Sequence, residues 1–256
     1  MVSHLLKFLP EDIVLRHYRE PFVGAGSLFF ALGPQTATLT DANAHLINCY
    51  QQVKTNPDLI HSYLTRHLRK TGEKYYYRMR EKYNKSRPSA AQAARFIYLN
   101  KTCFNGVFRV NRLGQFNVPY GWKEPPPLPS MQELSIASNA LSKSNIARLD
   151  FKDAMSNGKE SDFFYLDPPY PPLNGTSFFT HYTKDRFSIA DQVELSRLIH
   201  RLNDKGCKFM MSNAHTDLTR KLYSMYNQYE ISVRRWVTSR AKKHFVSEMI
   251  VTNYTS

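Results

Sequence analysis

Four consecutive residues, Asp167, Pro168, Pro169 and Tyr170, have the types and spacing that suit chemistry on an amino group. They follow the apolar run 163–166, which predicts a strand, although an ordinary rigid turn after that strand is the alternative. Two prolines fix φ and remove two backbone donors, so the carbonyls of Asp167 and Pro168 remain available as acceptors. With the Asp167 carboxylate, they would hold both N–H bonds of an exocyclic amine and favour a pyramidal nitrogen that attacks an electrophilic methyl group. Tyr170 would stack on the ring that carries the amine.

A glycine-rich segment, residues 21–27 (PFVGAGS), is the second candidate. Gly24 and Gly26 let the backbone turn tightly and approach a bound ligand. Taken alone, the segment is compatible with many nucleotide binders and with a bare structural turn. Asp41, at the end of the next predicted strand, is placed to accept hydrogen bonds from ribose hydroxyls. A helix N-cap or an Asx turn is the alternative role for Asp41.

The elements that must position these residues form an α/β pattern. The opening predicts a strand ending near Phe22, a helix at 28–32 stopped by Gly33 and Pro34, a strand at 37–40 and a helix at 43–54. Such a βαβ opening predicts a parallel sheet with a right-handed crossover, which brings the glycine loop and residues 41–43 together at its carboxyl edge. Further strands are predicted at 146–150, 163–167, 208–212, 229–235 and 248–254, with helices near 189–203 and 216–226. Only a loop joins the last two strands, so they should pair antiparallel.

The alternating pattern stops between about residues 57 and 141. Helices are predicted at 59–68, 73–83 and 90–100, followed by a loop at 105–129 that is rich in Gly, Asn and Pro. This stretch therefore reads as an insertion or subdomain within the α/β chain.

Positive charge is concentrated in the same stretch. The whole chain of 256 residues has a net charge of +14, which points to a polyanionic partner. Between His61 and Lys123, only Glu73 and Glu81 oppose a large set of basic residues. These are Arg66, Arg69, Lys70, Lys74, Arg78, Arg80, Lys82, Lys85, Arg87, Arg95, Lys101, Arg109, Arg112 and Lys123. Contacts with phosphates are the favoured interpretation, and a solvated basic surface is the alternative.

Composition excludes several classes of protein. No run approaches about 18 apolar residues, and the start of the chain is too charged for a secretory signal, so we expect no membrane association. Cys49, Cys103 and Cys207 have neither the spacing of metal ligands nor that of a disulfide framework. We therefore expect packed, reduced thiols, a cytoplasmic location and no metal site. The length suits one sizeable core, or one domain with a large insertion.

At this point the sequence resembles the Dam-type DNA adenine-N6 methyltransferases, of group alpha and the D12 class. The resemblance extends from about residue 5 to residue 254. It rests on PFVGAGS, the segment TDAN at 40–43, YYRMREKYNK at 76–85, FNG at 104–106, QFNVPYG at 115–121, Asp150 with Phe151, and DPPYPPL followed by FFTHYT. Motifs of these kinds in this order are specific to that family.

The resemblance implies an S-adenosylmethionine-dependent, Rossmann-like α/β methyltransferase whose sheet is mostly parallel with its last strand antiparallel. Residues 1–56 and 142–256 would form the catalytic domain, and 57–141 an inserted helical target-recognition domain. Asp41 would hold the ribose of the cofactor, Asp150 and Phe151 would contact its adenine, and Asp167 would face both cofactor and target base. The cofactor site would also include Phe22, Gly24, Ala25, Gly26, Ser27 and Asn43.

The resemblance also implies contacts with double-stranded DNA. Phe104 would be the intercalating aromatic and Asn105 the contact with the orphaned thymine. Arg109 would read guanine O6 and N7, a bidentate contact worth about 1–3 kcal/mol of discrimination, with a phosphate contact as its alternative role. Other expected DNA contacts are Val107, Asn117, Pro119 and Lys123.

The leading hypothesis is a monomeric enzyme that flips an adenine out of duplex DNA and methylates its N6 in a GATC-like target, with no metal. Two departures from the family pattern bear on it. Members usually begin with Lys-Trp-x-Gly-Gly-Lys, whereas this sequence starts just after that position, so a sequence-specific DNA-binding protein without catalysis is the rival. Trp122 and Lys123 stand where the family commonly has Arg-Tyr-Lys, which affects one target-reading contact. Methylation of RNA or of a protein amide is a weaker rival, because amide methylases usually have Asn before Pro-Pro-Tyr.

Overall fold

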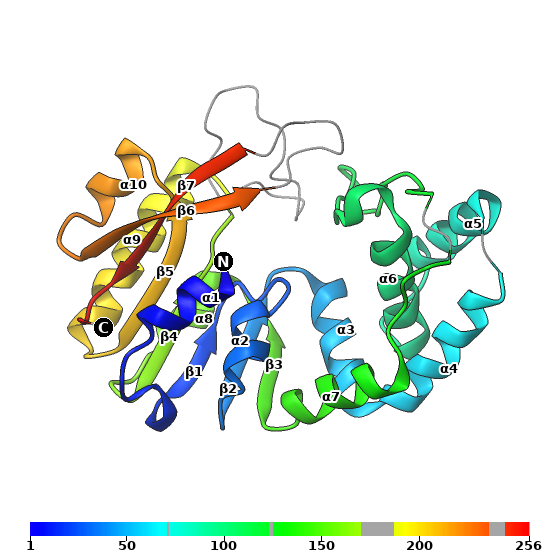
Figure 1. Cartoon of the computed structure of the whole chain (residues 1–256), viewed down its shortest axis with the longest axis horizontal. Coiled ribbons are helices and arrows are strands. Elements are labelled where there is room, and N and C mark those ends of the chain that lie inside the picture. Colours follow the sequence, from blue (N-terminus) through cyan, green and yellow to red (C-terminus); the bar gives the residue numbers. More distant parts are fainter. Residues whose placement is uncertain (71, 123–124, 170–186, 236–243, 256) are drawn as a thin grey trace. The chain divides into compact units, whose positions relative to one another are not determined.

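The computed structural model describes residues 1–70, 72–122, 125–169, 187–235 and 244–255 (Figure 1). The described residues group into two compact units. The first contains residues 1–42 and the described residues from 149 onward, and the second contains 43–148. The second unit thus begins and ends outside the predicted insertion 57–141, whose role as a recognition domain stays a prediction.

The sheet has seven strands in the order β3-β2-β1-β4-β5-β7-β6. In the first unit these are β1 (His17–Glu20), β2 (Ala37–Asp41), β4 (Asp162–Leu166), β5 (Lys208–Ala214), β6 (Asn227–Arg235) and β7 (His244–Thr252), and β3 is Ser144–Arg148. β1 pairs in parallel with β2 and with β4, and β4 pairs in parallel with β5. β7 is antiparallel to both β5 and β6. The predicted α/β class, with a mostly parallel sheet and an antiparallel final strand, is confirmed.

Some strand limits differ from the prediction for local reasons. β1 ends at Glu20 rather than near Phe22, because Pro21 lacks the N–H that a ladder requires. The strand predicted at 146–150 lies at 144–148 instead, because Asp150 is the N-cap of the next helix.

Helices of the first unit pack on both faces of this sheet. They are α1 (Val2–Leu5), α2 (Ser27–Leu32), α8 (Phe151–Ser156), α9 (Ile189–Asp204) and α10 (Asp217–Leu222). Neighbouring residues of β4 alternate between the faces. Phe163 contacts Tyr18, which in turn contacts Phe29 of α2. Phe164 belongs instead to a buried cluster with Ile199 of α9 and other apolar side chains. Because both faces are covered, all five residues of β4 are buried.

The second unit is mainly helical. Its helices are α3 (Ala44–Thr55), α4 (Pro57–Leu68), α5 (Glu73–Asn84), α6 (Ala90–Thr102) and α7 (Met131–Leu141), and a short 3₁₀ helix, η3, spans Phe104–Gly106. The buried side chains of Asn48 on α3 and Gln92 on α6 are joined by a hydrogen bond of 2.6 Å. Tyr76 and Tyr83 of α5 are buried as well, so their rings are part of this core rather than exposed aromatics.

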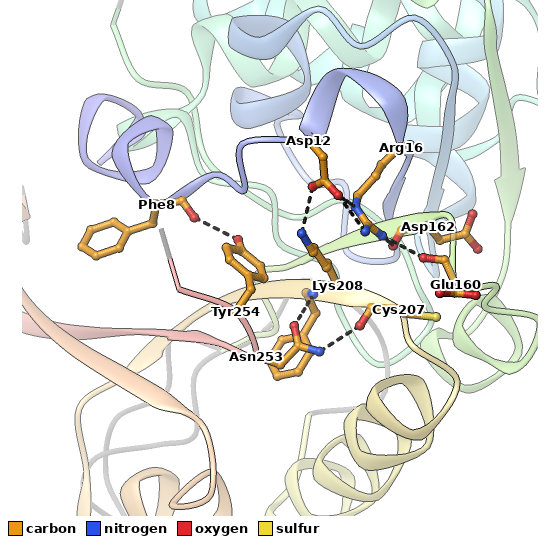
Figure 2. Close-up of polar contacts among 10 residues, drawn as sticks. Phe8, Asp12, Arg16, Glu160, Asp162, Cys207, Lys208, Asn253 and Tyr254 are labelled. Atoms are coloured by element: carbon orange, nitrogen blue, oxygen red, sulfur yellow. Dashed lines mark hydrogen bonds and ion pairs between the residues drawn. The ribbon is translucent and has the colours of Figure 1, made fainter.

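Hydrogen bonds and ion pairs hold residues 8–16 against other parts of the first unit (Figure 2). Asp12 accepts hydrogen bonds from Arg16, at 2.8 Å from Nη2, and from Lys208 Nζ, at 3.0 Å. Arg16 Nη1 also donates to the Glu160 carbonyl at 2.7 Å, and Tyr254 donates to the Phe8 carbonyl at 2.9 Å. Residues 8–16 are therefore hydrogen-bonded to three residues that are remote in sequence, Glu160, Lys208 and Tyr254.

We expect the Asp12→Asn variant to lose about 1 kcal/mol or less of stability at neutral pH, because the pair is partly exposed. The hydrogen bond from Arg16, with a further one from Lys208, lowers the pKa of Asp12 from 3.8 to about 2. A carboxylate whose pKa is lowered by folding stabilises the protein above its unfolded pKa, and this stabilisation is lost as pH falls through the folded pKa. The stability difference between wild type and variant should therefore be constant above about pH 5 and vanish only below about pH 2. Denaturant unfolding across that range measures it, with Glu11→Gln as a neighbouring exposed control.

Candidate functional site

The glycine loop and the end of β2 lie side by side, as the βαβ opening predicted. Gly24 and Gly26 have φ values of +45° and +62°, in the left-handed region that favours glycine. The Gly24 N–H donates to Asp41 Oδ2 at 3.1 Å, and the Val23 N–H donates to the Thr40 carbonyl at 3.0 Å. The Asp41 carboxylate therefore connects the end of β2 to the glycine loop. The N-cap of the following helix is Asn43 rather than Asp41.

A buried carboxylate lies at the start of this loop. Glu20 ends β1, is 2% exposed and accepts a hydrogen bond of 2.9 Å from the Tyr18 hydroxyl. Burial raises the pKa of Glu20 well above its usual value, and the charges of Asp167 and Asp41 raise it further, while the bond from Tyr18 opposes the shift. β1 pairs in parallel with both β2 and β4, so Glu20, Asp41 and Asp167 lie at the same edge of the sheet.

Asp167 lies directly after β4, at the same edge of the sheet. It is exposed, whereas Pro168 is buried and Pro169 is partly buried. The strand register sets Leu166 beside Met211, so the next residue of β5, Ser212, lies next to Asp167. Ser212 Oγ donates to Asp167 Oδ1 at 2.8 Å and is 3.1 Å from the Tyr165 hydroxyl. With Ser212 donating to the carboxylate, Tyr165 is the donor to Ser212, and this chain orients Asp167.

One further predicted cofactor residue, Phe151, contacts the glycine segment 21–27 in the first unit. The rings of Phe22 and Phe151 are stacked, with centroids 5.4 Å apart. Asp150 is exposed and caps α8 by accepting a hydrogen bond from the Lys152 N–H at 3.0 Å. Ala25 and Ser27 are exposed in the loop and at the first position of α2.

Asn43, also predicted for the cofactor site, has a structural role in the second unit. Its side-chain oxygen accepts hydrogen bonds from the backbone N–H groups of His45 and Leu46, and it caps α3. Asn43 is buried, at 9% exposed. A cofactor contact from its side chain stays a prediction.

The predicted DNA-contacting residues gather on one loop of the second unit, which begins where α6 ends. Phe104 is 50% exposed and Val107 is 42% exposed. Asn105 is exposed and has φ +53°, a conformation that Asn tolerates better than most residues and that often marks functional sites. Arg109 and Pro119 are exposed, and Asn117 is partly exposed. These six side chains are therefore accessible from solvent on a single structural element.

Hydrogen bonds between the backbone segments 102–104 and 119–121 hold Phe104 and Asn105 in place. The Phe104 N–H donates to the Pro119 carbonyl and the Gly121 N–H donates to the Thr102 carbonyl, each at 2.9 Å. A Cβ at Gly121 would lie 2.6 Å from the carbonyl carbon of Cys103 and 2.8 Å from the Phe104 nitrogen, and would also overlap the Cys103 oxygen. Gly121 thus permits the close approach of the two segments.

We expect Gly121→Ala to destabilise the second unit by about 1–3 kcal/mol, because the obstacle is backbone that cannot rotate away. The same change should weaken DNA binding, since it displaces the segment carrying Phe104. Thermal unfolding and DNA titration measure the two effects. Affinity for S-adenosylmethionine serves as an internal control and should not change. If Gly121→Ala has the stability and the DNA affinity of the wild type, the close approach of these two segments is not required for either.

Two of the predicted site residues and several other predictions remain to be placed. Tyr170 and Lys123 lie outside the described residues. Within the described part of the chain, no group of three or more His, Cys, Asp or Glu side chains could hold a metal, and no helix is long and apolar enough to cross a bilayer. The three cysteines are buried and form no disulfide with one another, and burial raises the pKa of the Cys49 thiol to about 12.

Sequence reasoning did not select Glu20, Tyr18 or Ser212. Glu20 directly precedes the glycine loop, and Ser212 is a polar residue near the end of a predicted strand, which are signals that the sequence does contain. Their relation to Asp167 and Asp41 depends on strand order, and that order is visible only in the folded chain.

Comparison with known proteins identifies the family of this chain. A profile of the D12 class N6 adenine-specific DNA methyltransferase family matches residues 1–237. This chain belongs to that family. A type II methyltransferase of Lactococcus lactis subsp. cremoris, M1.LlaDCHI, is 38% identical over 99% of this chain and 91% of its own length. M.MjaIII, a type II methyltransferase of Methanocaldococcus jannaschii, is 34% identical over 99% of this chain and 95% of its own length.

A DNA adenine methylase of Serratia marcescens is 35% identical over 93% of this chain and 88% of its own length. The predicted Dam-type resemblance is therefore confirmed, and the D12 class methyltransferase described here is a DNA adenine-N6 methyltransferase. Membership of a methyltransferase family implies use of S-adenosylmethionine, and it implies DNA as the substrate.

Proposed function

We propose that this chain flips an adenine out of duplex DNA and transfers the methyl group of S-adenosylmethionine to its N6, within a GATC-like target. The observation that carries the proposal is the placement of Asp41 and Asp167 at the ends of β2 and β4, the two parallel neighbours of β1, with Asp41 bonded to the glycine loop. Acidic side chains at this edge of the sheet favour a cationic ligand. S-adenosylmethionine has a positively charged sulfonium and an ammonium group, so the residues present fit it.

Each cofactor contact follows from this arrangement. Asp41 accepts hydrogen bonds from the ribose hydroxyls, and the left-handed backbone at Gly24 and Gly26 leaves room for the ligand beside the loop. The stacked Phe22 and Phe151 supply an apolar wall for the adenine ring. When bound, S-adenosylmethionine supplies the electrophilic methyl group.

Asp167 and the Pro168 carbonyl hold the target amine in this proposal. Each accepts one of the two N6–H bonds, which points the nitrogen lone pair away from the ring plane. The Asp167 carboxylate balances the positive charge that develops on the nitrogen during attack. Ser212 keeps the carboxylate in the required orientation. Tyr170 stacks on the flipped base, and the surrounding DNA is contacted by Phe104, Asn105, Val107, Arg109 and Pro119.

Methyl transfer to matched duplexes tests the proposal. Two duplexes that differ only in the adenine of one GATC are incubated with protein and radiolabelled S-adenosylmethionine. We expect label only in the duplex that retains the adenine, and equal labelling of both would reject the proposed target. A monomeric state and a cytoplasmic location are further predictions, and sedimentation with and without DNA measures the first.

Calorimetry with S-adenosylmethionine tests the cofactor part of the proposal. We expect binding by the wild type, and a lack of detectable binding would overturn the proposed cofactor contacts.

A further inference from the structure

The segment that carries Arg109 is a short antiparallel hairpin. Val110 and Phe116 form a bridge across it, and the Asn117 N–H donates to the Arg109 carbonyl at 3.1 Å. At the turn, Asn111 Oδ1 accepts hydrogen bonds from the N–H groups of Leu113 and Gln115. Arg109 and Asn117 therefore face each other on neighbouring strands of one hairpin.

α5 fixes the strand that bears Asn117. Asn84 both donates to the Phe116 carbonyl and accepts from the Phe116 N–H, at 3.0 and 2.9 Å. On the other side, the Val118 carbonyl accepts hydrogen bonds from the Tyr76 hydroxyl and from Arg80, at 2.9 and 3.0 Å. Phe116 and Val118 are each 2% exposed. The backbone of Asn117 is thus held on both sides, while its side chain remains outside the core.

Asn117 occupies one edge of the Arg109 guanidinium. Nε of Arg109 donates to Asn117 Oδ1 at 2.8 Å, and Nη2 lies 3.4 Å from the Asn117 carbonyl oxygen. Nε and Nη2 form the side edge of the guanidinium fork. No hydrogen bond of Nη1 is recorded among the described residues, so the end edge, formed by Nη1 and the second N–H of Nη2, remains available.

We propose that Asn117 is a positioning residue that holds Arg109 by its side edge and leaves its end edge to read the guanine of the target. An arginine reads guanine with two parallel N–H bonds to O6 and N7, and either edge could supply them. Occupation of the side edge by a rigid partner selects the end edge and removes rotamer freedom before DNA arrives. Asn117 thereby acts on specificity through Arg109. This inference rests on the proposed GATC-like target.

A different role for Asn117 is a direct phosphate contact. Such a contact would raise affinity for every sequence alike, because phosphates carry no base information. A positioning role instead acts on the ratio of kcat/KM between the target and a duplex whose target guanine pair is replaced by an adenine pair. The two roles are therefore separated by that ratio rather than by affinity.

The experiment compares this ratio among variants. We expect Asn117→Ala to reduce discrimination about tenfold, the scale of a degraded bidentate contact. Asn117→Asp keeps an acceptor for Nε, so it should retain discrimination even though its charge weakens binding to all duplexes. Gln115→Ala removes another amide of the same hairpin, whose side-chain oxygen accepts a hydrogen bond from Asn111 at 3.1 Å, and should leave the ratio unchanged. In an Arg109→Ala background, Asn117→Ala should cause no further loss of discrimination.

NMR of the arginine Nε–H groups in the free protein gives a readout that needs no DNA. The Nε–H of Arg109 should exchange slowly with water in the wild type and in Asn117→Asp, and rapidly in Asn117→Ala. Rapid exchange in the wild type would overturn the inference. So would undiminished discrimination in folded Asn117→Ala, or loss of discrimination in the Asp variant. A wild type that does not distinguish the two duplexes, yet shows a protected Nε–H, would instead refute the proposed target.

Discussion

Asp167→Asn should reduce the rate of methyl transfer by about a thousandfold while leaving the fold and the affinity for DNA nearly unchanged. Asn has the same shape and can still meet the Ser212 hydroxyl that donates to Asp167 Oδ1 at 2.8 Å. It lacks the negative charge that balances the developing charge on N6, and it presents an amide N–H where an acceptor is needed. Single-turnover transfer with saturating cofactor and DNA isolates this step from binding.

Asp153→Asn is the matched control for this variant. Asp153 is an exposed acid of α8 in the same unit and belongs to no predicted site. The control removes the same charge and should keep full activity. An Asp167→Asn enzyme within about threefold of the wild type would contradict the assigned role, since removing a preorganised contact normally costs far more.

Asp41→Ala should weaken binding of S-adenosylmethionine by more than about a hundredfold. Two hydrogen bonds from ribose hydroxyls to a carboxylate would be lost, and bonds to charged groups contribute about 1.5–3 kcal/mol each. The variant also removes the acceptor of the Gly24 N–H, which joins the glycine loop to the end of β2. Calorimetric titration of the cofactor measures the change.

Asp41→Asn separates these two contributions. It retains an oxygen for the Gly24 N–H but has no charge, so its cofactor affinity should lie between those of the wild type and Asp41→Ala. DNA affinity, measured without cofactor, should be the same in all three proteins. Equal cofactor affinity in Asp41→Ala and the wild type would remove Asp41 from the site.

The convergence of acids also constrains the state of Glu20. Its pKa is raised by burial and by its neighbours Asp167 and Asp41. Replacing either neighbour with a neutral residue removes a repulsion and should bring the pKa of Glu20 closer to its usual value. Variants at these positions therefore alter the shared electrostatics of the cluster as well as their own contacts.

Much of the architecture follows from local sequence. The strand predicted at 163–167 is present as β4 (Asp162–Leu166), and it ends just before the two prolines, which cannot continue a ladder. Gly33 ends α2 in the left-handed region, as its place before Pro34 suggested. The glycines at 24 and 26 likewise have the positive φ values that a tight turn requires. These features depend on the φ preferences of single residues, which are properties of the chain itself.

The sequence by itself therefore determined the α/β pattern, the family resemblance and the identities of the acid after β4 and the glycine turn after β1. Only the tertiary structure decided how distant side chains meet. Ser212 reaches Asp167 because of the register of β4 and β5, and Asn117 meets the edge of Arg109 because α5 holds the hairpin. The physical reason is that a hydrogen bond between remote residues requires their separation to be set within a few tenths of an ångström. Packing and strand register set that separation, and neither is encoded within a short window of sequence.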